Sequence, residues 1–405
     1  MRIVFLTQYY PPEIGAPQRR LSGLARRLVQ RGHDVTVLTA MPNYPKGVIH
    51  PGYGGFVRTE ERDGAKVIHA FIYPTQKADY IRRLANYFSF VLSSAVAGSA
   101  LLKRSEYLLV ESPPLFLGLA AFWLSRLKRS RLIFNVSDLW PESPVRLGML
   151  RRGSAVHRVS EWLEGFCYRR SWLVTGQART ILEDIVRRFP RAATYHLSNG
   201  VDTAQYRAER RTEEARARLA TNGDCLALYA GLHGLAQGLD QVLGAAHQIA
   251  EEGGCRFVFI GEGPEKQALK DKAEELRLTN TLFLDSLPSA EMPPLVASAD
   301  IILVTLKLFI PGAVPSKLYE AMAAGRPVVL VADGEAAEIV RDNNAGIVVR
   351  PGDINGLAQA IRRLRDQPAL RRELGENGRK AAEDRFDSTK IADRFIDHLE
   401  ASRPS

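Results

Sequence analysis

Short apolar runs alternate with helical segments from one end of the chain to the other. The first half begins with a predicted strand over 2–6, a helix over 18–32 that ends at Gly32, and a second strand over 34–39. Nine further strands are predicted, at 66–72, 107–112, 131–137, 172–176, 225–231, 256–263, 282–286, 299–306 and 327–332. This alternation predicts an α/β fold with open parallel sheets covered by helices.

The chain contains more residues than one hydrophobic core usually organises. With 405 residues it is expected to form two domains. A turn signal over 198–207 marks the boundary, so we predict Rossmann-like domains over 1–198 and 199–382. The remaining helical segment, 383–405, is expected to pack back toward the first domain. Ligands of such sheets bind outside the carboxyl ends of the strands, so two facing domains would form a cleft.

Charge is spread unevenly over the two predicted domains. Residues 1–200 hold 29 Lys and Arg against 14 Asp and Glu, whereas residues 201–405 hold 26 against 31. A basic domain suits nucleic acid, anionic lipid or a phosphorylated substrate. The chain has no recognisable nucleic-acid-binding motif, so we expect no nucleic acid partner.

The cysteines and the first residues indicate the compartment. Cys167, Cys225 and Cys255 have no metal-binding or redox spacing, which favours buried thiols in a reduced compartment. The start, MRIVFLTQYYPP, reads as a first strand and not as a signal peptide. We therefore expect a cytoplasmic protein.

An uncharged segment, Leu84 to Leu102, stands between Arg82-Arg83 and Lys103-Arg104. Its 19 residues are just long enough to span a bilayer, but one asparagine and four serines dilute it. We predict a helix that is partly buried and partly laid on an anionic membrane surface, with the arginines at the headgroups. A fully buried core helix and a true span remain alternatives.

The segment 311–340 predicts a helix followed by a buried parallel strand. Proline at position 315 suits the first position of a helix, and Gly325 suits its end. Free N–H groups around Ser316 and Lys317 would bind an anion, helped by the helix dipole. Glu320, one turn further on the same face as Lys317, has a carboxylate that suits the two hydroxyls of a ribose. The pattern favours a nucleotide site; an ordinary capped helix with a surface Lys–Glu pair is the alternative.

Three motifs resemble a known family: SNGVD at 198–202, GEGP at 261–264 and EAMAAGRPVV at 320–329. They are similar to the retaining family-4 glycosyltransferases of GT-B fold, and the resemblance covers nearly the whole chain. Six more motifs resemble the branch of N-acetylfucosamine transferases of O-antigen and capsule synthesis and the colanic-acid enzymes: YYPPEIGA (9–16), TAMPNYPKG (39–47), RRLANYFSF (82–90), DLWPES (138–143), GLAQGLD (234–240) and VPSKLYE (314–320).

The resemblance implies transfer of a sugar from a nucleotide-diphosphate donor, with retention at the anomeric carbon, no metal and no cofactor. The donor would be UDP-linked, carry an N-acetylated amino or deoxy hexose and bind the C-terminal domain. The acceptor would bind the N-terminal domain. A polyprenyl-diphosphate-linked saccharide would suit both the basic charge and the apolar helix. The expected location is the inner face of the cytoplasmic membrane, with peripheral attachment.

The resemblance also implies functional residues. Glu320 would bind the ribose, and Ser316 and Lys317 would hold the diphosphate. The full set expected to bind the donor is Gly15, Ala16, Arg19, His233, Gly234, Gln237, Gly263, Leu287, Ser316, Lys317, Leu318 and Glu320.

DLWPES follows a predicted strand where the family often has a His-Asp element. Ser137 replaces the histidine here, and Asp138 remains. Asp138 and Glu142 are the candidates to orient or deprotonate the acceptor hydroxyl. Asp138 as the cap of the next turn is the alternative. Attack on the face of departure needs no enzyme nucleophile, so none is assigned.

Three further departures from the common family pattern matter. Gly312 stands where the first glutamate of a pair is usual, and Leu232 and Gln237 lie where a phosphate-binding arginine and lysine are usual. Lys317 or Arg19 would then compensate. These losses keep open a non-catalytic partner subunit, and the fold keeps open a nucleotide-sugar 2-epimerase.

Overall fold

The computed structural model describes residues 1–44, 47–75, 80–146, 148, 150–219, 223–309 and 312–403. Pro45 and Lys46 of one motif, and Pro311 of another, lie outside this set. The chain divides into two compact units: unit 1 is Met1–Asn199 with Thr389–Ser405, and unit 2 is Gly200–Ser388. The division thus falls after Asn199, where we expected it after residue 198.

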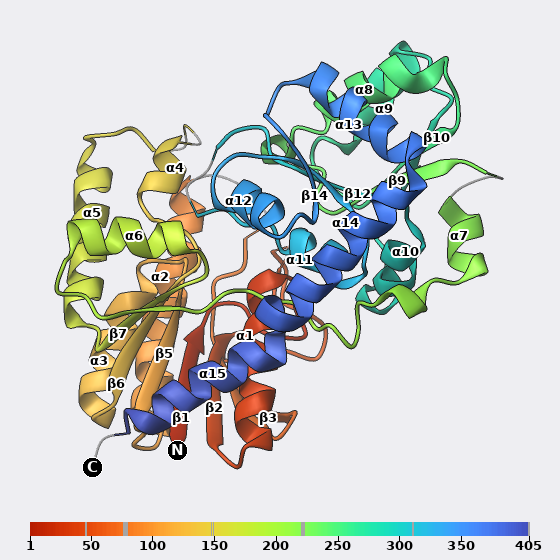
Figure 1. Ribbon diagram of the computed structural model, residues 1–405. Helices are drawn as coiled ribbons and strands as arrows, with labels where there is room; N and C mark the ends of the chain where they lie inside the picture. The colour runs from red at the N-terminus through yellow and green to blue at the C-terminus, as the bar shows by residue number, and fades with distance from the viewer. Residues whose placement is uncertain are drawn as a thin grey trace. The chain divides into compact units, whose positions relative to one another are not determined.

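Unit 1 contains an eight-stranded sheet of order β3-β4-β2-β1-β5-β6-β7-β8 (Figure 1). All its neighbouring strands are parallel except β3 and β4. The strands are β1 (Arg2–Thr7), β2 (Asp34–Ala40), β3 (Val57–Arg62), β4 (Ala65–Ala70), β5 (Tyr107–Ser112), β6 (Arg131–Val136), β7 (Leu173–Gly176) and β8 (Thr194–His196).

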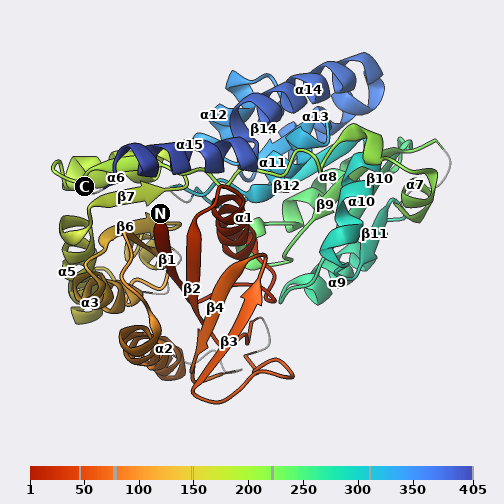
Figure 2. The ribbon, with the colours of Figure 1, turned by 90° about the horizontal axis from the view of Figure 1, so that it is seen from below.

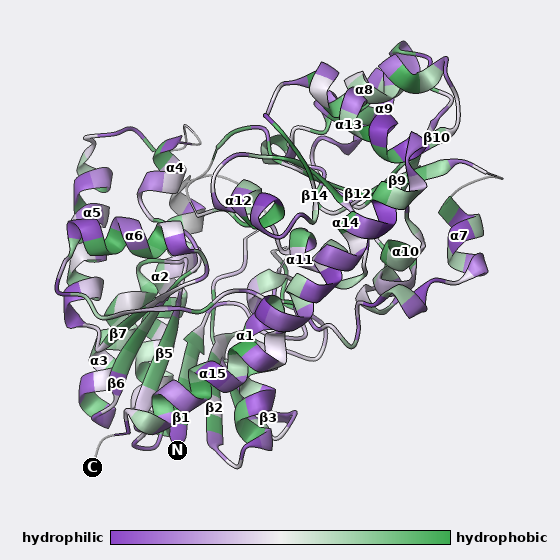
Figure 3. Cartoon of the chain, in the orientation of Figure 1, coloured by the Kyte–Doolittle hydropathy of each residue, from purple (hydrophilic) through white to green (hydrophobic). Residues whose placement is uncertain are grey.

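The helices of unit 1 cover both faces of this sheet. They are α1 (Ala16–Gln30), α2 (Tyr80–Leu101), α3 (Leu117–Lys128), α4 (Glu142–Arg146), α5 (Ala155–Arg170), α6 (Arg179–Arg188) and α15 (Ser388–Ala401). Figure 2 shows α6 and α15 on one side of the strands and α2, α3 and α5 on the other. Strands buried on both faces explain the continuous apolar runs, which Figure 3 colours green in β5 and β6.

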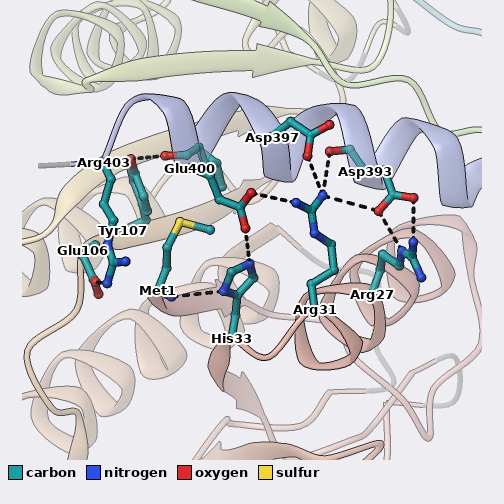
Figure 4. A network of polar contacts seen from close by, with 11 residues as sticks. Met1, Arg27, Arg31, His33, Glu106, Tyr107, Asp393, Asp397, Glu400 and Arg403 are labelled. Carbon is teal, nitrogen blue, oxygen red and sulfur yellow. Dashed lines mark hydrogen bonds and ion pairs between the residues drawn. The ribbon is translucent and has the colours of Figure 1, made fainter.

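The C-terminal helix α15 is part of the unit 1 core. Phe395, Ile396 and Leu399 are fully buried among residues of β1 and α1. Tyr107 on β5 donates its hydroxyl to the Leu399 carbonyl at 2.7 Å. Ion pairs line the contact with α1, including Arg27 with Asp393 at 2.8 Å (Figure 4). The segment from 389 onward therefore folds with the first 199 residues.

Helix α2 contains the uncharged segment predicted from the sequence. Its window Leu84–Leu101 has a mean hydropathy of 1.3, and 39% of it is buried. Among the described residues, it alone forms a helix long and apolar enough to cross a membrane by length and composition. The polar residues Asn86, Ser93 and Ser94 are buried, and their amide and hydroxyl groups each donate a hydrogen bond to a nearby carbonyl.

Unit 2 contains a six-stranded parallel sheet of order β11-β10-β9-β12-β13-β14. Its strands are β9 (Cys225–Ala230), β10 (Cys255–Ile260), β11 (Thr281–Leu284), β12 (Ile301–Thr305), β13 (Val328–Val331) and β14 (Gly346–Val349). Its helices are α7 (Glu213–Leu219), α8 (Asp240–Ala250), α9 (Lys266–Glu275), α10 (Met292–Ser298), α11 (Ser316–Ala323), α12 (Glu335–Asp342), α13 (Ile354–Asp366) and α14 (Pro368–Ala381). The described part of this unit also has three short 3-10 helices, η1 (Ala208–Arg210), η2 (Leu235–Gln237) and η3 (Ser289–Glu291), and a π-helix, η4 (Ala382–Phe386).

The predicted α/β fold with two Rossmann-like units is confirmed, and the differences are local. The sequence did not indicate β3, β8 or β14. β3 is polar and contains no buried residue, because it is an edge strand, antiparallel to β4. Helix α11 starts at Ser316, so Pro315 is its N-cap and not its first residue. Gly325 ends the helix as predicted, with a φ of +65°.

Candidate functional site

The carboxyl ends of β9 and β12 form the switch point of the unit 2 sheet, because the strand order runs outward from this pair on both sides. Ligands of open α/β sheets bind at such a point. The two following loops are joined there: Lys307 N–H donates to the Ala236 carbonyl, and the Thr305 hydroxyl donates to the Gln237 carbonyl, both at 2.8 Å. The predicted residues Gly234 and Gln237 thus lie in a loop fixed at this position.

Lys317 extends from α11 to the end of β9. A Cβ atom built on Gly231 would lie 2.2 Å from Lys317 Cε and 2.8 Å from its Nζ. The ammonium group therefore lies directly against the backbone at the carboxyl end of β9. The first turn of α11 adds N–H groups that no helical carbonyl satisfies and the positive end of the helix dipole. Together they form a positively charged corner suited to a phosphate.

The loops after β9 and β10 approach each other too closely for any side chain. A Cβ on Gly261 would lie 1.8 Å from the Gly231 carbonyl oxygen, and one on Gly263 would lie 2.2 Å from the His233 carbonyl oxygen. Both glycines also have positive φ, +149° and +159°. Packing of the two loops is therefore sufficient to explain the glycine at the predicted position 263.

His233 is fully buried, and neither of its ring nitrogens has a hydrogen-bond partner among the described residues. Burial, followed by the charge of Lys266, lowers the pKa of His233 to about 4, so the ring is neutral at pH 7. Its ring centroid lies 5.9 Å from that of Tyr229 and 6.4 Å from that of Phe283. His233 thus contributes the shape of a neutral ring beneath the loop and no charge.

The other predicted residues of α11 differ in what they offer a ligand. Ser316 and Glu320 are partly buried, so both keep an accessible surface. Leu318 is fully buried, and its N–H donates to the Pro315 carbonyl at 3.0 Å. Its side chain and N–H are therefore occupied within unit 2. The buried Gly312, with a φ of +76°, stands where a glutamate was expected.

Leu287, one of the residues predicted to bind the donor, follows β11 and is partly buried. Nearby, Asp285 pairs with Lys266 at 2.6 Å, and the same ammonium pairs with Glu262 at 2.8 Å. These pairs tie the loops after β10 and β11 together. A pocket of about 510 Å³ also occurs in unit 2, but it is lined by residues such as Arg326 and contains none of the predicted donor residues.

In unit 1, α1 begins at Ala16 with Gly15 as its N-cap. Gly15 is extended, and a Cβ there would lie 2.4 Å from Gln18 Oε1. Arg19 is exposed, whereas the side chain of the next residue, Arg20, is only 6% exposed. Arg20 therefore lies at the carboxyl edge of the sheet, whereas the predicted Arg19 keeps an exposed side chain.

Arg20 is the centre of a buried polar network at the carboxyl ends of β5 and β6, which also includes Asn199 after β8. Its guanidinium donates to Glu111 Oε1 at 2.6 Å, to Ser137 Oγ at 2.7 Å and to Asn199 Oδ1 at 2.6 Å. Asn135 donates to the second Glu111 oxygen at 2.6 Å, and Ser137 donates to the first. Glu111 is only 2% exposed, so its charge is neutralised almost entirely by this arginine.

The two predicted acid–base carboxylates have opposite environments. Burial raises the pKa of Asp138, although Ser143 and the Leu139 N–H donate to it. Burial acts in the same direction on Glu142, but Arg146 and Arg152 at 2.9 and 2.8 Å outweigh it and lower its pKa. Asp138 therefore suits proton acceptance near neutral pH better than Glu142 does.

Sequence reasoning missed Arg20, Glu111 and Asn135. A signal existed for Glu111, because a carboxylate inside the apolar run YLLVES needs a cation or several donors. Nothing in the sequence distinguishes Arg20 from Arg19 as that cation. For metals, no group of three or more His, Cys, Asp or Glu side chains with ligand geometry occurs within the described part of the chain.

Two family models match the chain. The glycosyl transferase 4-like domain matches residues 15–200, and the glycosyl transferases group 1 model matches residues 211–381. WcaI of Escherichia coli K12, assigned to colanic acid biosynthesis, is 24% identical over 98% of this chain and 100% of its own. The glycosyltransferase WbjE of Pseudomonas aeruginosa is 27% identical over 69% of this chain and 71% of its own.

Solved structures show the same fold. Sucrose-phosphate synthase of Thermosynechococcus elongatus matches with a TM-score of 0.78 and 18% identity, over 99% of this chain and 100% of that one. Anabaena HepE, solved with UDP and glucose, matches with a TM-score of 0.74 and 19% identity over the same shares. With the two family models, which adjoin and cover most of the sequence, these matches lead to one conclusion: the chain belongs to the family-4 glycosyltransferases of GT-B fold, and it is similar to colanic-acid and O-antigen enzymes.

Proposed function

We propose that this glycosyltransferase moves an N-acetylated amino or deoxy hexose from a UDP-linked donor to a polyprenyl-diphosphate-linked saccharide, with retention and without a metal. The reaction would serve surface polysaccharide synthesis at the inner face of the cytoplasmic membrane. The names of its relatives support this role: WcaI is assigned to colanic acid biosynthesis, and HepE was solved with UDP-glucose.

One observation carries the donor assignment: the Lys317 ammonium lies against Gly231 at the switch point of the unit 2 sheet. A diphosphate bound there would meet both the ammonium and the positive N-terminal end of α11. Glu320 lies three residues further along α11 than Lys317, on the same face of the helix, and its carboxylate would accept the hydroxyls of the ribose. His233, neutral and buried, would support the loop without repelling or attracting the phosphates.

The proposed chemistry uses the departing diphosphate. The bond between the anomeric carbon and the phosphate oxygen breaks, and a bond to the acceptor hydroxyl oxygen forms on the same face. The charge that grows on the leaving oxygen would be stabilised by Lys317 and the α11 N–H groups. The hydroxyl proton leaves to Asp138, whose raised pKa suits a proton acceptor, or to the diphosphate itself.

The exposed stripe of α2 supports the membrane proposal. Its exposed apolar residues are Phe88, Leu92, Val96 and Leu101. Exposed basic residues stand at both ends of the stripe: Arg82 lies in the first turn of α2, and Lys103 and Arg104 follow the end of the helix. Beside the stripe, the exposed Trp123 of α3 donates its indole N–H to Ser99 at 3.1 Å. An apolar stripe with a tryptophan and basic ends suits the interface of an anionic bilayer.

Thermal-shift titration tests the donor assignment. UDP, GDP and ADP, each free and sugar-linked, are compared on the wild type, Lys317→Met and Glu320→Ala. We expect UDP to stabilise the wild type by about 2.7 kcal/mol at a hundred times its dissociation constant, and both variants to lose most of this. Lys380→Met, an exposed lysine on α14, is the matched control. A panel without any nucleotide response would refute the assignment.

Product analysis without acceptor separates transferase from epimerase. Isomerisation of the donor sugar would refute the transferase proposal, whereas transfer that requires a lipid-linked saccharide supports it.

Membrane attachment has its own test: flotation with vesicles of phosphatidylcholine, with and without phosphatidylglycerol. We expect Leu92→Glu to weaken binding and Val186→Glu, an exposed site on α6, to leave it unchanged. Equal binding of both variants would refute a role of the α2 stripe.

A further inference from the structure

Three neighbouring parallel strands of unit 1 are each followed by a tyrosine. Tyr9 follows β1, Tyr44 follows β2 and Tyr73 follows β4, and the sheet order places β2 between the other two. The carboxyl ends of parallel strands share one edge, so the three segments leave the sheet at the same edge. Adjacent strands lie about 4.8 Å apart, so the three strand ends span about 10 Å, the width of two sugar rings.

The segments that hold these tyrosines are fixed by buried polar groups. Glu13 is 4% exposed, and its Oε1 accepts the N–H groups of Asn43 and Tyr44 at 2.7 and 2.8 Å. Burial raises the pKa of Glu13, although these two N–H groups act against it. A buried carboxylate is costly, and here it holds the backbone of a tyrosine that is itself 44% exposed.

Helix α2 fixes the third segment in the same way. Asn86 donates to the Tyr73 carbonyl at 2.7 Å, and Ser89 accepts the Tyr73 N–H at 2.8 Å. Asn86 also accepts from Gln8 at 3.0 Å, which joins α2 to the end of β1. The side chain of Tyr73 nevertheless remains 44% exposed.

The rings of Tyr9 and Tyr44 are in contact, and Tyr9 is partly buried whereas Tyr44 is exposed. The Tyr9 and Tyr44 centroids lie 5.8 Å apart with planes at 68°, an edge-to-face pair. Gln8 donates to the Tyr9 hydroxyl at 3.3 Å, which fixes that ring as well. Rigid tyrosines present an apolar face and a hydroxyl at little cost in conformational entropy, which is what recognition of a pyranose ring requires.

We propose that Tyr9, Tyr44 and Tyr73 form a platform that binds one or two pyranose rings of the acceptor saccharide. This inference rests on the proposed function, because it assigns the acceptor of that transfer to a defined edge of unit 1. Glu13 and Asn86 are positioning residues, since they hold the backbone of the platform. The same helix that carries Asn86 also carries the exposed Phe88 and Leu92, so the platform adjoins the stripe proposed to meet the lipid.

Saturation-transfer NMR tests the platform directly, with octyl β-N-acetylglucosaminide, octyl glucoside and octyl galactoside as probes on the full-length protein. For at least one probe, we expect saturation to be transferred to the C–H protons of its pyranose ring. Tyr44→Ala and Tyr73→Ala should each weaken binding about tenfold, the loss of one aromatic contact. Tyr44→Phe and Tyr73→Phe keep the ring and should bind within about threefold of the wild type.

Two further variants test positioning. Glu13→Gln keeps an acceptor oxygen for both N–H groups and should retain sugar binding, whereas Glu13→Ala should lose it. Saturation confined to the protons of the octyl chain would mean that the protein binds only the alkyl part of the probe, and this would refute the platform. The platform would also be refuted if Tyr44→Ala and Tyr73→Ala both bound the sugars as the wild type does, at an unchanged melting temperature. The UDP thermal shift, measured on the same samples, reports separately on the donor site, so failure of the proposed function is recognised independently.

Discussion

Replacement of Arg20 by methionine should destabilise unit 1 far more than replacement of a surface arginine. The side chains of Arg20 and Glu111 are 6% and 2% exposed, so the substitution leaves a carboxylate buried without its counter-ion. Removal of one partner of such a pair costs about 3–5 kcal/mol. Arg27→Met is the matched control on the same helix, because Arg27 and its partner Asp393 are 34% and 30% exposed. We expect it to cost at most about 1 kcal/mol.

A double substitution separates the buried charge from lost packing. Glu111→Gln removes the carboxylate charge and keeps most of its volume. In the variant with both Arg20→Met and Glu111→Gln, no uncompensated charge remains. The double variant should therefore lose less stability than the sum of the single losses, by about 1–3 kcal/mol.

Urea unfolding followed by tryptophan fluorescence is the appropriate assay, because all four tryptophans lie in unit 1. They are Trp123, Trp140, Trp162 and Trp172. The signal then reports this unit without interference from unit 2. Strictly additive losses, or a cost for Arg20→Met no larger than for Arg27→Met, would refute the argument from burial.

Further predictions concern the glycine loops and two titrating groups. Gly231→Ala should abolish most of the UDP thermal shift at unchanged melting temperature, because the new methyl group displaces the flexible end of Lys317. Gly263→Ala should instead lower the melting temperature itself, because its methyl group meets the backbone of His233. Since the folded pKa of His233 is about 4 against 6.5 for the free group, unit 2 should lose stability as the pH falls from about 6.5 to about 4. His233→Phe should lack this loss in melts followed by circular dichroism. A hydrogen bond from Arg27 lowers the pKa of Asp393 below its ordinary 3.8. The stability that this pair gives to unit 1 is therefore present above about pH 3.8 and is lost as the pH falls further. Asp393→Asn should be less stable at neutral pH and should lack this acid-dependent part, which urea titrations at several pH values will measure.

The sequence predicted the strands that are buried on both faces and the edge strand β11, and it missed the edge strands β3, β8 and β14. Apolar runs such as 107–112 and 327–332 are long enough to indicate a parallel strand without any tertiary information. The edge strands β3 and β8 have no buried face pattern of this kind, because solvent contacts part of their surface. Their pairing depends on neighbours that are distant in sequence, which a local pattern does not contain.

The helix that carries several of the candidate site residues was predictable from a local pattern. Proline before a helix and a lysine in its first turn indicated α11, and Lys317 indeed reaches the end of β9. The choice between Arg19 and Arg20 depends on which side of α1 faces the sheet at its carboxyl edge. Both positions follow the same loop, and only the packing of α1 against β1 and β5 decides which arginine meets Glu111.

The buried polar network around Arg20 and Glu111 explains why Ser137 stands where a histidine is usual. A small hydroxyl at this position accepts from Arg20 and donates to Glu111, so it fits between two buried charges. An imidazole is much larger and would need the space that the guanidinium fills. The loss of the histidine and the presence of a buried Arg–Glu pair are therefore one structural solution. It leaves Asp138, next in the chain, as a carboxylate whose pKa is raised by burial and not lowered by an arginine.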